Sequence, residues 1–359
     1  MQPTRLVSVF VLVGALLGAG AACSSKAPEN KAVVDPGPVS LRLGTADDSD
    51  APGGAAITEF VRLVRTASGG KLLIYPVWQA SGSEVREWDQ GVARMVKNEQ
   101  LPMGMIPARA WDTEGVTSLR ALNAPFLVTS DALADEIVGT SDLAGEMMAG
   151  LDKAGVSGLA LLPEGLRHPF GFGHALVTPK DYAGKGVRAP RSDLGDATIR
   201  ALGGKPDDAV GDGYAAGARD GTLTGAETGF VLSLDLPAPA VAVANLTFNT
   251  KVNTLVINSK VLNGLSAVNR KILQDAATAT QRWVLTHRTT ESANATAFCN
   301  NGGKIVNATP AQLQAATQAV QPLYTALEKD TATKTQLDRI RQLKQSLKIP
   351  AEDKATLCP

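Results

Sequence analysis

The chain has 359 residues, with 44% hydrophobic residues, 4% aromatic residues and 35 side chains each of basic and acidic type. This length predicts about two domains with sizeable cores. A formal net charge of +0 and scarce aromatic side chains argue against a nucleic acid or an anionic membrane surface as the partner.

The N-terminus is typical of a bacterial export signal. Arg5 precedes an apolar run from residue 6 to 22, and small residues lead into Cys23. We expect residues 1–22 to be a signal peptide, Cys23 to be acylated as in a lipoprotein, and the proline-containing residues 23–39 to form a flexible tether. The alternative is an uncleaved membrane anchor. Either interpretation places the body outside the cytoplasmic membrane, attached to its outer face or periplasmic.

Two further cysteines, Cys299 and Cys358, form an even pair. In an oxidising compartment a disulfide between them is expected, and it would attach the C-terminal tail, residues 351–359, to the body. Two free thiols are the alternative.

Strand and helix patterns alternate along the first half of the body. Apolar runs predict strands at residues 41–44, 72–77, 103–106 and 159–162. Helical spacing predicts helices at residues 55–68, from a cap at Ser83 to residue 96, and at residues 132–154. This alternation is typical of a mostly parallel sheet covered by helices.

The alternation resumes after a glycine-rich break. A strand at residues 186–190 stops at Pro190, Ser192 caps the next helix, and strands follow near residues 227–231 and 255–258. Residues 266–298 contain neither Gly nor Pro and predict one helix of roughly 45 Å, long enough to bridge two lobes.

Motifs for catalysis, metals and cofactors are missing from the sequence. The three histidines, His168, His174 and His287, lack the ligand spacing of a zinc site. Nucleophile elbows, phosphate loops and dinucleotide fingerprints do not occur. The acidic run at residues 47–50 lacks the downstream Gly and Glu of a calcium loop and favours a solvated loop. The sequence thus predicts no cofactor, no metal and no enzymatic activity.

Six motifs follow one another in a characteristic order between about residues 41 and 347. The most specific reads Thr-Pro-x-Asp-x-x-Gly-x-x-x-Arg-x-Pro and is matched completely by residues 178–190. The others are the Gly-Gly-Lys turn and strand at residues 68–76, the polar turn at 79–84, Ala-Pro-Phe-Leu at 124–127, Gly-x-Arg at 165–167 and the segment 221–227. In these motifs the chain resembles the solute-binding proteins of tripartite ATP-independent periplasmic (TRAP) transporters, of the dicarboxylate-binding type.

The resemblance implies an α/β, two-lobed periplasmic-binding-protein fold with a cleft between the lobes and a long helix bridging them. We expect residues 40–164 and 250–285 in lobe 1, and residues 165–249 and 286–350 in lobe 2. It also implies capture of a small carboxylate by hinge closure and delivery to a separate membrane permease.

Arg188 is the residue for which the resemblance implies the main contact to the ligand carboxylate. A guanidinium offers parallel donors that match a carboxylate, and Arg188 ends a strand, where open α/β sheets place their ligand groups. The resemblance implies that Arg167 contacts or supports the ligand, and Glu227 is interpreted as orienting an arginine. A surface salt bridge for Arg188 and packing between lobes for Arg167 are the alternatives.

The sequence departs from the family pattern at two positions, where Thr224 replaces an Asp and Thr228 replaces an Asn, so the ligand is expected to differ from the family's usual acids. The predicted ligand-binding residues are Arg188, Arg167, Glu227, Thr228, Asn249 and Trp111. Asn253 is a further candidate for a polar contact. Trp78 and Arg109 are also candidates, and packing is an equal interpretation for these two and for Trp111.

Two other functions remain open at this stage. A sensory module would present the ligand to a receptor kinase instead of a permease. An extracellular enzyme would need an acid or nucleophile in the cleft, for which Glu164, Glu227 and His168 are the candidates.

Overall fold

The computed structural model describes residues 38–359 except 83–85, 234–235 and 237–238. The predicted signal peptide, Cys23 and nearly all of the tether lie outside these residues. The described residues form one compact unit, so the lobe boundaries stay a prediction.

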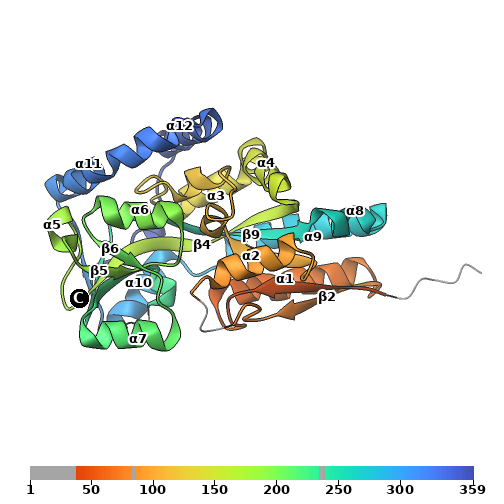
Figure 1. Ribbon diagram of the computed structural model, residues 1–359, viewed down its shortest axis with the longest axis horizontal. Coiled ribbons are helices and arrows are strands. Elements are labelled where there is room, and N and C mark those ends of the chain that lie inside the picture. Colours follow the sequence, from red (N-terminus) through yellow and green to blue (C-terminus); the bar gives the residue numbers. More distant parts are fainter. Residues whose placement is uncertain (1–37, 83–85, 234–235, 237–238) are drawn as a thin grey trace, which may run out of the picture. The chain divides into compact units, whose positions relative to one another are not determined.

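Two groups of strands share one long strand, β4 (Figure 1). The first group has the order β2 (Leu72–Val77), β1 (Val39–Thr45), β3 (Met103–Pro107), β9 (Asn249–Asn258) and β4 (Val156–Phe172). The second continues from β4 to β7 (Leu223–Thr228), β5 (Gly186–Arg188) and β6 (Lys205–Asp207), with β8 (Ala240–Val243) and β10 (Lys304–Val306) beside them.

The strand directions are mixed, whereas the sequence pattern predicted a mostly parallel sheet. β1 pairs in parallel with β2 and β3, and β5 with β6 and β7. The strands between these parallel sets, β9 and β4, run antiparallel to each other and to their other neighbours. The difference arises because the chain returns through β9 after completing most of the second group.

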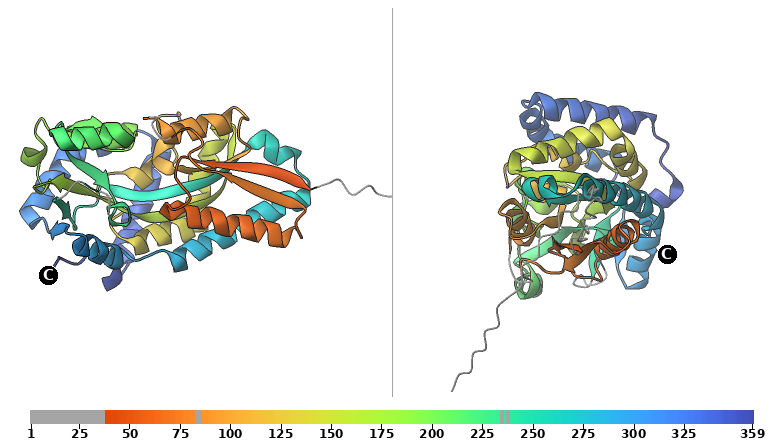
Figure 2. Two further views of the ribbon diagram at one scale, coloured as in Figure 1. Left: turned by 90° about the horizontal axis from the view of Figure 1, so that it is seen from below. Right: turned by 90° about the vertical axis from the view of Figure 1, so that its right-hand side faces the viewer.

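Helices cover both faces of the first group of strands (Figures 1 and 2). One face packs on α1 (Pro52–Ala67) and α9 (Ala267–His287), and the other on α2 (Trp88–Lys97) and α3 (Asp131–Gly139). The sequence of α1 explains its packing on the sheet. Apolar residues recur at helical spacing and form one face of the helix, where Ile57, Phe60 and Val64 are each at most 1% exposed.

The remaining helices surround the second group or flank the first. They are α4 (Ser141–Ala149), α5 (Pro179–Tyr182), α6 (Asp193–Ala201), α7 (Gly211–Asp220), α8 (Ser259–Gly264), α10 (Glu291–Asn300), α11 (Pro310–Leu327) and α12 (Thr331–Ser346). Short 3₁₀ turns include η1 (Ala108–Trp111), η2 (Arg120–Asn123), η3 (Gly150–Ala154), η4 (Phe230–Leu232) and η5 (Ala351–Asp353). The predicted cap at Ser192 is confirmed, because Ser192 Oγ accepts a hydrogen bond from Gly195 N at the start of α6. Ser83, the other predicted cap, lies outside the described residues, and α2 begins at Trp88. At the start of α11, Thr309 forms a capping box.

The predicted helix at residues 266–298 is two helices, α9 and α10. The backbone of Arg288 is extended, and Thr290 starts α10 by accepting a hydrogen bond from Ala293 N. Consecutive threonines compete with the helix for backbone hydrogen bonds and favour such a cap. α9 packs on α1 and β4, whereas α10 packs on η4 and β10, so each helix serves one group of strands.

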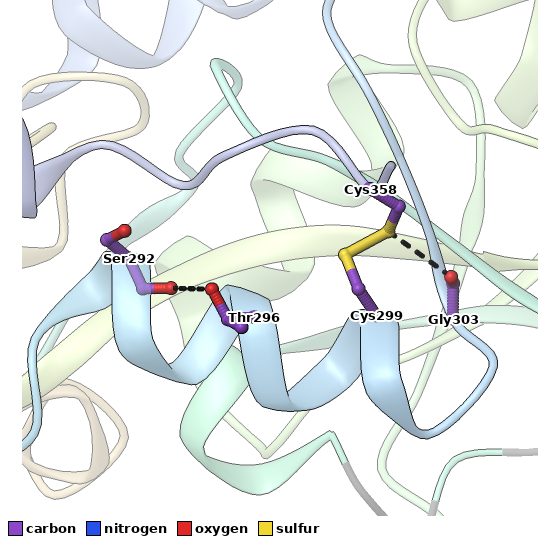
Figure 3. Close-up of a disulfide and its surroundings, with 5 residues drawn as sticks. All are labelled: Ser292, Thr296, Cys299, Gly303 and Cys358. Carbon is purple, nitrogen blue, oxygen red and sulfur yellow. Dashed lines mark hydrogen bonds between the residues drawn. A yellow bond between two sulfur atoms is a disulfide. The ribbon is translucent and has the colours of Figure 1, made fainter.

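The predicted disulfide is confirmed. Cys299 in α10 bonds to Cys358 with an S–S distance of 2.09 Å (Figure 3). It holds the C-terminal tail against α10, and the tail reaches α3, where Asp353 accepts a hydrogen bond from Ala132 N.

Candidate functional site

A cavity of ≈ 250 Å³ lies where β5, β7, β4 and β9 come together with α2 and α7. Four cationic side chains line it: Arg109, Arg167, Arg188 and Lys251. The structure thus brings the two arginines of the sequence motifs, Arg167 and Arg188, to the same cavity, and such a concentration of positive charge suits an anion.

Three of the four cations already have carboxylate partners. Arg167 Nε lies 2.8 Å from Glu227 Oε1, and Arg109 Nη2 lies 2.6 Å from Asp89 Oδ2. Lys251 Nζ lies 2.7 Å from a Glu164 oxygen and 3.2 Å from an Asp47 oxygen. These charges are neutralised by the fold itself.

The Arg167–Glu227 pair is deeply buried, with each residue 5% exposed. Although burial would raise the pKa of Glu227, the charge and hydrogen bond of Arg167 hold that pKa below its usual value. Burial likewise opposes the charge on Arg167, but Glu227 more than offsets it and the pKa of Arg167 is raised. The predicted role of Glu227 in orienting an arginine agrees with this geometry.

Arg188 differs from the other three cations. Its Nε donates to Ala209 O at 3.1 Å, and within the described part of the chain no carboxylate pairs with it. The guanidinium carbon lies 5.6 Å from the ring centroid of Trp88 and 5.3 Å from that of Tyr214. Burial, followed by the charge of Arg167, lowers the pKa of Arg188 to about 10.

The aromatic neighbour Trp88 is itself held in place. Its Nε1 donates to Asp89 at 2.7 Å, and Asp89 also receives the hydrogen bond from Arg109. Trp88 starts α2 on the first group of strands, while Arg188 ends β5 in the second. The contact between them therefore joins the two sides of the cavity.

Ion pairs join the same two sides beside the cavity. Arg86 lies 2.8 Å from Asp208, and Arg191 lies 3.0 Å from Glu87. Gln90 in α2 also donates to Arg191 O at 3.0 Å. This set of contacts joins α2 and the residues before it to the loop before α6 and the loop between β6 and α7.

Two other predicted site residues lie at or beside the cavity. Thr228, at the end of β7, lines it and is 5% exposed, and its hydroxyl has no hydrogen-bond partner among the described residues. Asn249, at the start of β9, lines a smaller neighbouring cavity of ≈ 20 Å³ together with Glu227. Arg109 lines both cavities.

Trp111 does not reach the cavity, contrary to its predicted role in ligand binding. It is 0% exposed in the core under α2 and donates from Nε1 to Thr254 Oγ1 at 2.9 Å. The sequence placed it correctly after a strand, but η1 turns the ring inward. Trp78 packs against the core on the α1 face, and Asn253 donates to Glu164 Oε2 at 2.8 Å.

The remaining candidates for an acid or nucleophile are engaged in structural contacts. His168 is 1% exposed, and its ring nitrogens contact Glu291 Oε1 at 2.7 Å and Leu246 O at 3.1 Å. Glu164 is bound by Lys251 and Asn253. Neither arrangement positions a free proton donor at the cavity.

A larger cavity of ≈ 620 Å³ lies between the start of α1 and the end of α9. Its charged lining includes Asp48, Asp50 and Glu164, and its cation Arg288 is paired with Asp135 at 2.5 Å. Such a lining repels a carboxylate. The ≈ 250 Å³ cavity is therefore the better anion site, although it is smaller than this one.

Four residues of the site were not singled out by the sequence analysis: Trp88, Tyr214, Lys251 and Asp47. Trp88 had been assigned to a helical apolar face and Asp47 to a solvated loop. Asp47 instead pairs with Lys251 across the cavity. Only the fold places these residues together, because they come from four separate segments.

The described residues contain no group of three or more His, Cys, Asp or Glu side chains that could hold a metal ion. In the same part of the chain no helix has the length and apolar character needed to cross a membrane.

The shared central strand, the helix-covered strand groups and the cationic cavity are the features of a two-lobed α/β protein with a cavity that suits an anion. Residues 43–330 match the family model described as bacterial extracellular solute-binding protein, family 7. The chain belongs to this family, which confirms the resemblance drawn from the motifs.

Solved structures of periplasmic binding proteins share the fold. The sugar acid binding protein DctPAm from Advenella mimigardefordensis, in complex with galactonate, is 16% identical, with a TM-score of 0.75 over 87% of this chain and 99% of that one. A TRAP periplasmic solute-binding protein from Ralstonia eutropha with bound (S)-2-acetolactate is 17% identical, with a TM-score of 0.74 over 86% and 99%. Another from Bradyrhizobium, in complex with galacturonate, is 21% identical, with a TM-score of 0.73 over 84% and 99%. No curated protein matches.

Proposed function

We propose that this protein is the extracytoplasmic solute-binding subunit of a TRAP-type transporter and that it captures a small organic acid through Arg188. The observation that carries the proposal is the lone guanidinium: it lines a cavity, and no carboxylate among the described residues neutralises it. A ligand carboxylate would pair with its free donors in bidentate geometry. Binding of galactonate, acetolactate and galacturonate by proteins of the same fold supports an acid as the ligand.

The other predicted residues have supporting roles in this proposal. Arg167, fixed by Glu227, lends positive potential without pairing with the ligand. Thr228 offers a hydroxyl, and Asn249 supports the wall next to Glu227. Closure of the two sides, through Trp88 and the pairs Arg86–Asp208 and Glu87–Arg191, would trap the acid before delivery to a separate permease.

Calorimetry of a panel of small carboxylates tests the proposal. We expect at least one binder in the panel, with an affinity that Arg188→Ala lowers about 100-fold or more, because two charge-assisted hydrogen bonds are lost. Arg62→Ala is the matched control, since Arg62 is exposed and its one partner among the described residues is Glu59. Binders that are indifferent to Arg188→Ala would refute the site.

For the N-terminus we propose export through the signal in residues 1–22 and acylation of Cys23, which would attach the protein to the outer face of the membrane. Metabolic labelling with a fatty acid should mark the full-length chain and not its Cys23→Ser variant. Release of both forms into the soluble periplasmic fraction would contradict the anchor.

A further inference from the structure

Tyr214 in α7 has an unexplained hydroxyl group. The residue lines the ≈ 250 Å³ cavity, and the oxygen atom is buried without a hydrogen-bond partner among the described residues. Buried polar side-chain atoms in proteins nearly always have a partner, so each exception calls for a cause. If packing alone mattered here, phenylalanine would serve as well.

The ring and the hydroxyl of Tyr214 have separable tasks. The ring faces the Arg188 guanidinium, with its centroid 5.3 Å from the guanidinium carbon, and contacts Phe172. The hydroxyl contributes to neither contact. Burial raises the pKa of this hydroxyl, although the charge of Arg188 opposes the shift, so the group is a proton donor at neutral pH.

The polar side-chain groups of the cavity that lack partners among the described residues set the chemistry of the ligand. They are the outer donors of Arg188 and the hydroxyls of Thr228 and Tyr214. The other three cations are already paired with carboxylates. One free positive charge balances one carboxylate, and a second carboxylate would meet paired cations and the oxygens of Asp47. The two hydroxyls suit uncharged oxygen substituents.

We propose that Tyr214 is a specificity-determining residue, whose hydroxyl donates a hydrogen bond to an oxygen substituent of a monocarboxylate held by Arg188. This inference rests on the proposed function. It narrows the substrate class to hydroxy- or oxo-monocarboxylates and disfavours dicarboxylates and unsubstituted fatty acids.

Calorimetry with matched acids tests the inference on the full chain. The probes are butanoate, 2-hydroxybutanoate, 3-hydroxybutanoate, 2-oxobutanoate, gluconate, succinate and malate. We expect at least one oxygenated monocarboxylate to bind about tenfold or more tightly than its unsubstituted counterpart and than either dicarboxylate. Tyr214→Phe should remove most of this preference and leave the affinity for the unsubstituted acid within about twofold.

Tyr324→Phe is the matched control, because Tyr324 also lies 5.3 Å from an arginine, Arg341, but outside the cavity. It should leave the preference intact. If Tyr214→Phe weakens substituted and unsubstituted acids equally, or if a dicarboxylate binds most tightly, the inference is wrong. Binding that survives Arg188→Ala would instead refute the proposed function, so the two failures are distinguishable.

Discussion

The ≈ 250 Å³ cavity has two walls, and the cationic side chains on these walls differ in their partners. On the β4–β7–β9 wall, Arg167 and Lys251 are buried and each lies within 2.8 Å of a carboxylate oxygen. On the wall formed by β5, α7 and α2, Arg188 has aromatic rings as neighbours and, within the described residues, one hydrogen bond, which it donates to a backbone carbonyl. The cations of the first wall are paired within the protein, whereas Arg188 on the second wall keeps unused hydrogen-bond donors.

Two arginines in neighbouring motifs therefore need not share a role. A buried pair such as Arg167–Glu227 fixes geometry, because either member alone would be an uncompensated buried charge. An unpaired guanidinium lowers the stability of the empty protein but is ready for a ligand. Measurements of stability and affinity on variants of the two arginines separate these two roles.

The largest expected effect is on stability. Arg167→Ala should lower the free energy of unfolding by about 3–5 kcal/mol, because it leaves Glu227 buried without its partner. Chemical denaturation checks this value. The double variant Arg167→Met with Glu227→Met removes both charges and should recover most of the loss; if it is as unstable as the single variant, the pair is not what stabilises this wall.

Arg188→Met should change stability in the opposite direction, by raising the free energy of unfolding. Burial lowers the pKa of Arg188 to about 10, well below its ordinary value, so the charged form is disfavoured and the charge destabilises the fold at every pH below about 10. Replacement by an apolar side chain of similar length should raise the free energy of unfolding at pH 7 by about 1–3 kcal/mol while ligand binding is lost. A decrease in stability would show that Arg188 has a structural role like that of Arg167.

The affinity for the carboxylate should depend on pH in the alkaline range, above about pH 9. Binding needs the protonated guanidinium, and in the free protein its charge is lost as pH rises through about 10. Calorimetric affinity should therefore be flat from pH 6 to 9 and fall about tenfold by pH 11. Circular dichroism at each pH controls for unfolding. A flat profile across the whole range would mean that the ligand does not depend on Arg188.

The smallest effect is expected at Trp88. Its Ala variant should weaken ligand binding about 3- to 10-fold, because one cation–π contact to Arg188 and one link between the two sides are lost. The Phe variant keeps the ring face and should lose less. Stopped-flow fluorescence should assign the change to faster dissociation; an unchanged dissociation rate would argue that Trp88 does not hold the cavity closed.

The fold class, the family and the disulfide Cys299–Cys358 could be predicted from the sequence, and its motifs single out Arg188 and Arg167 as candidates, which line one cavity. These features are carried by local periodicity, ordered motifs and a cysteine count, all of which can be read along the chain. The cap at Ser192 could also be predicted, because capping depends on a few neighbouring residues.

The partner of each charged side chain could not be predicted from the sequence, because these partners come from distant segments of the chain and meet only in the tertiary structure. The tertiary structure paired Lys251 with Asp47, brought Trp88 and Tyr214 to Arg188, and turned Trp111 into the core. It also interrupted the long helix at Arg288. Periodicity reports which face of an element is apolar, but which side chains meet across a cavity depends on packing between elements that the linear pattern does not contain.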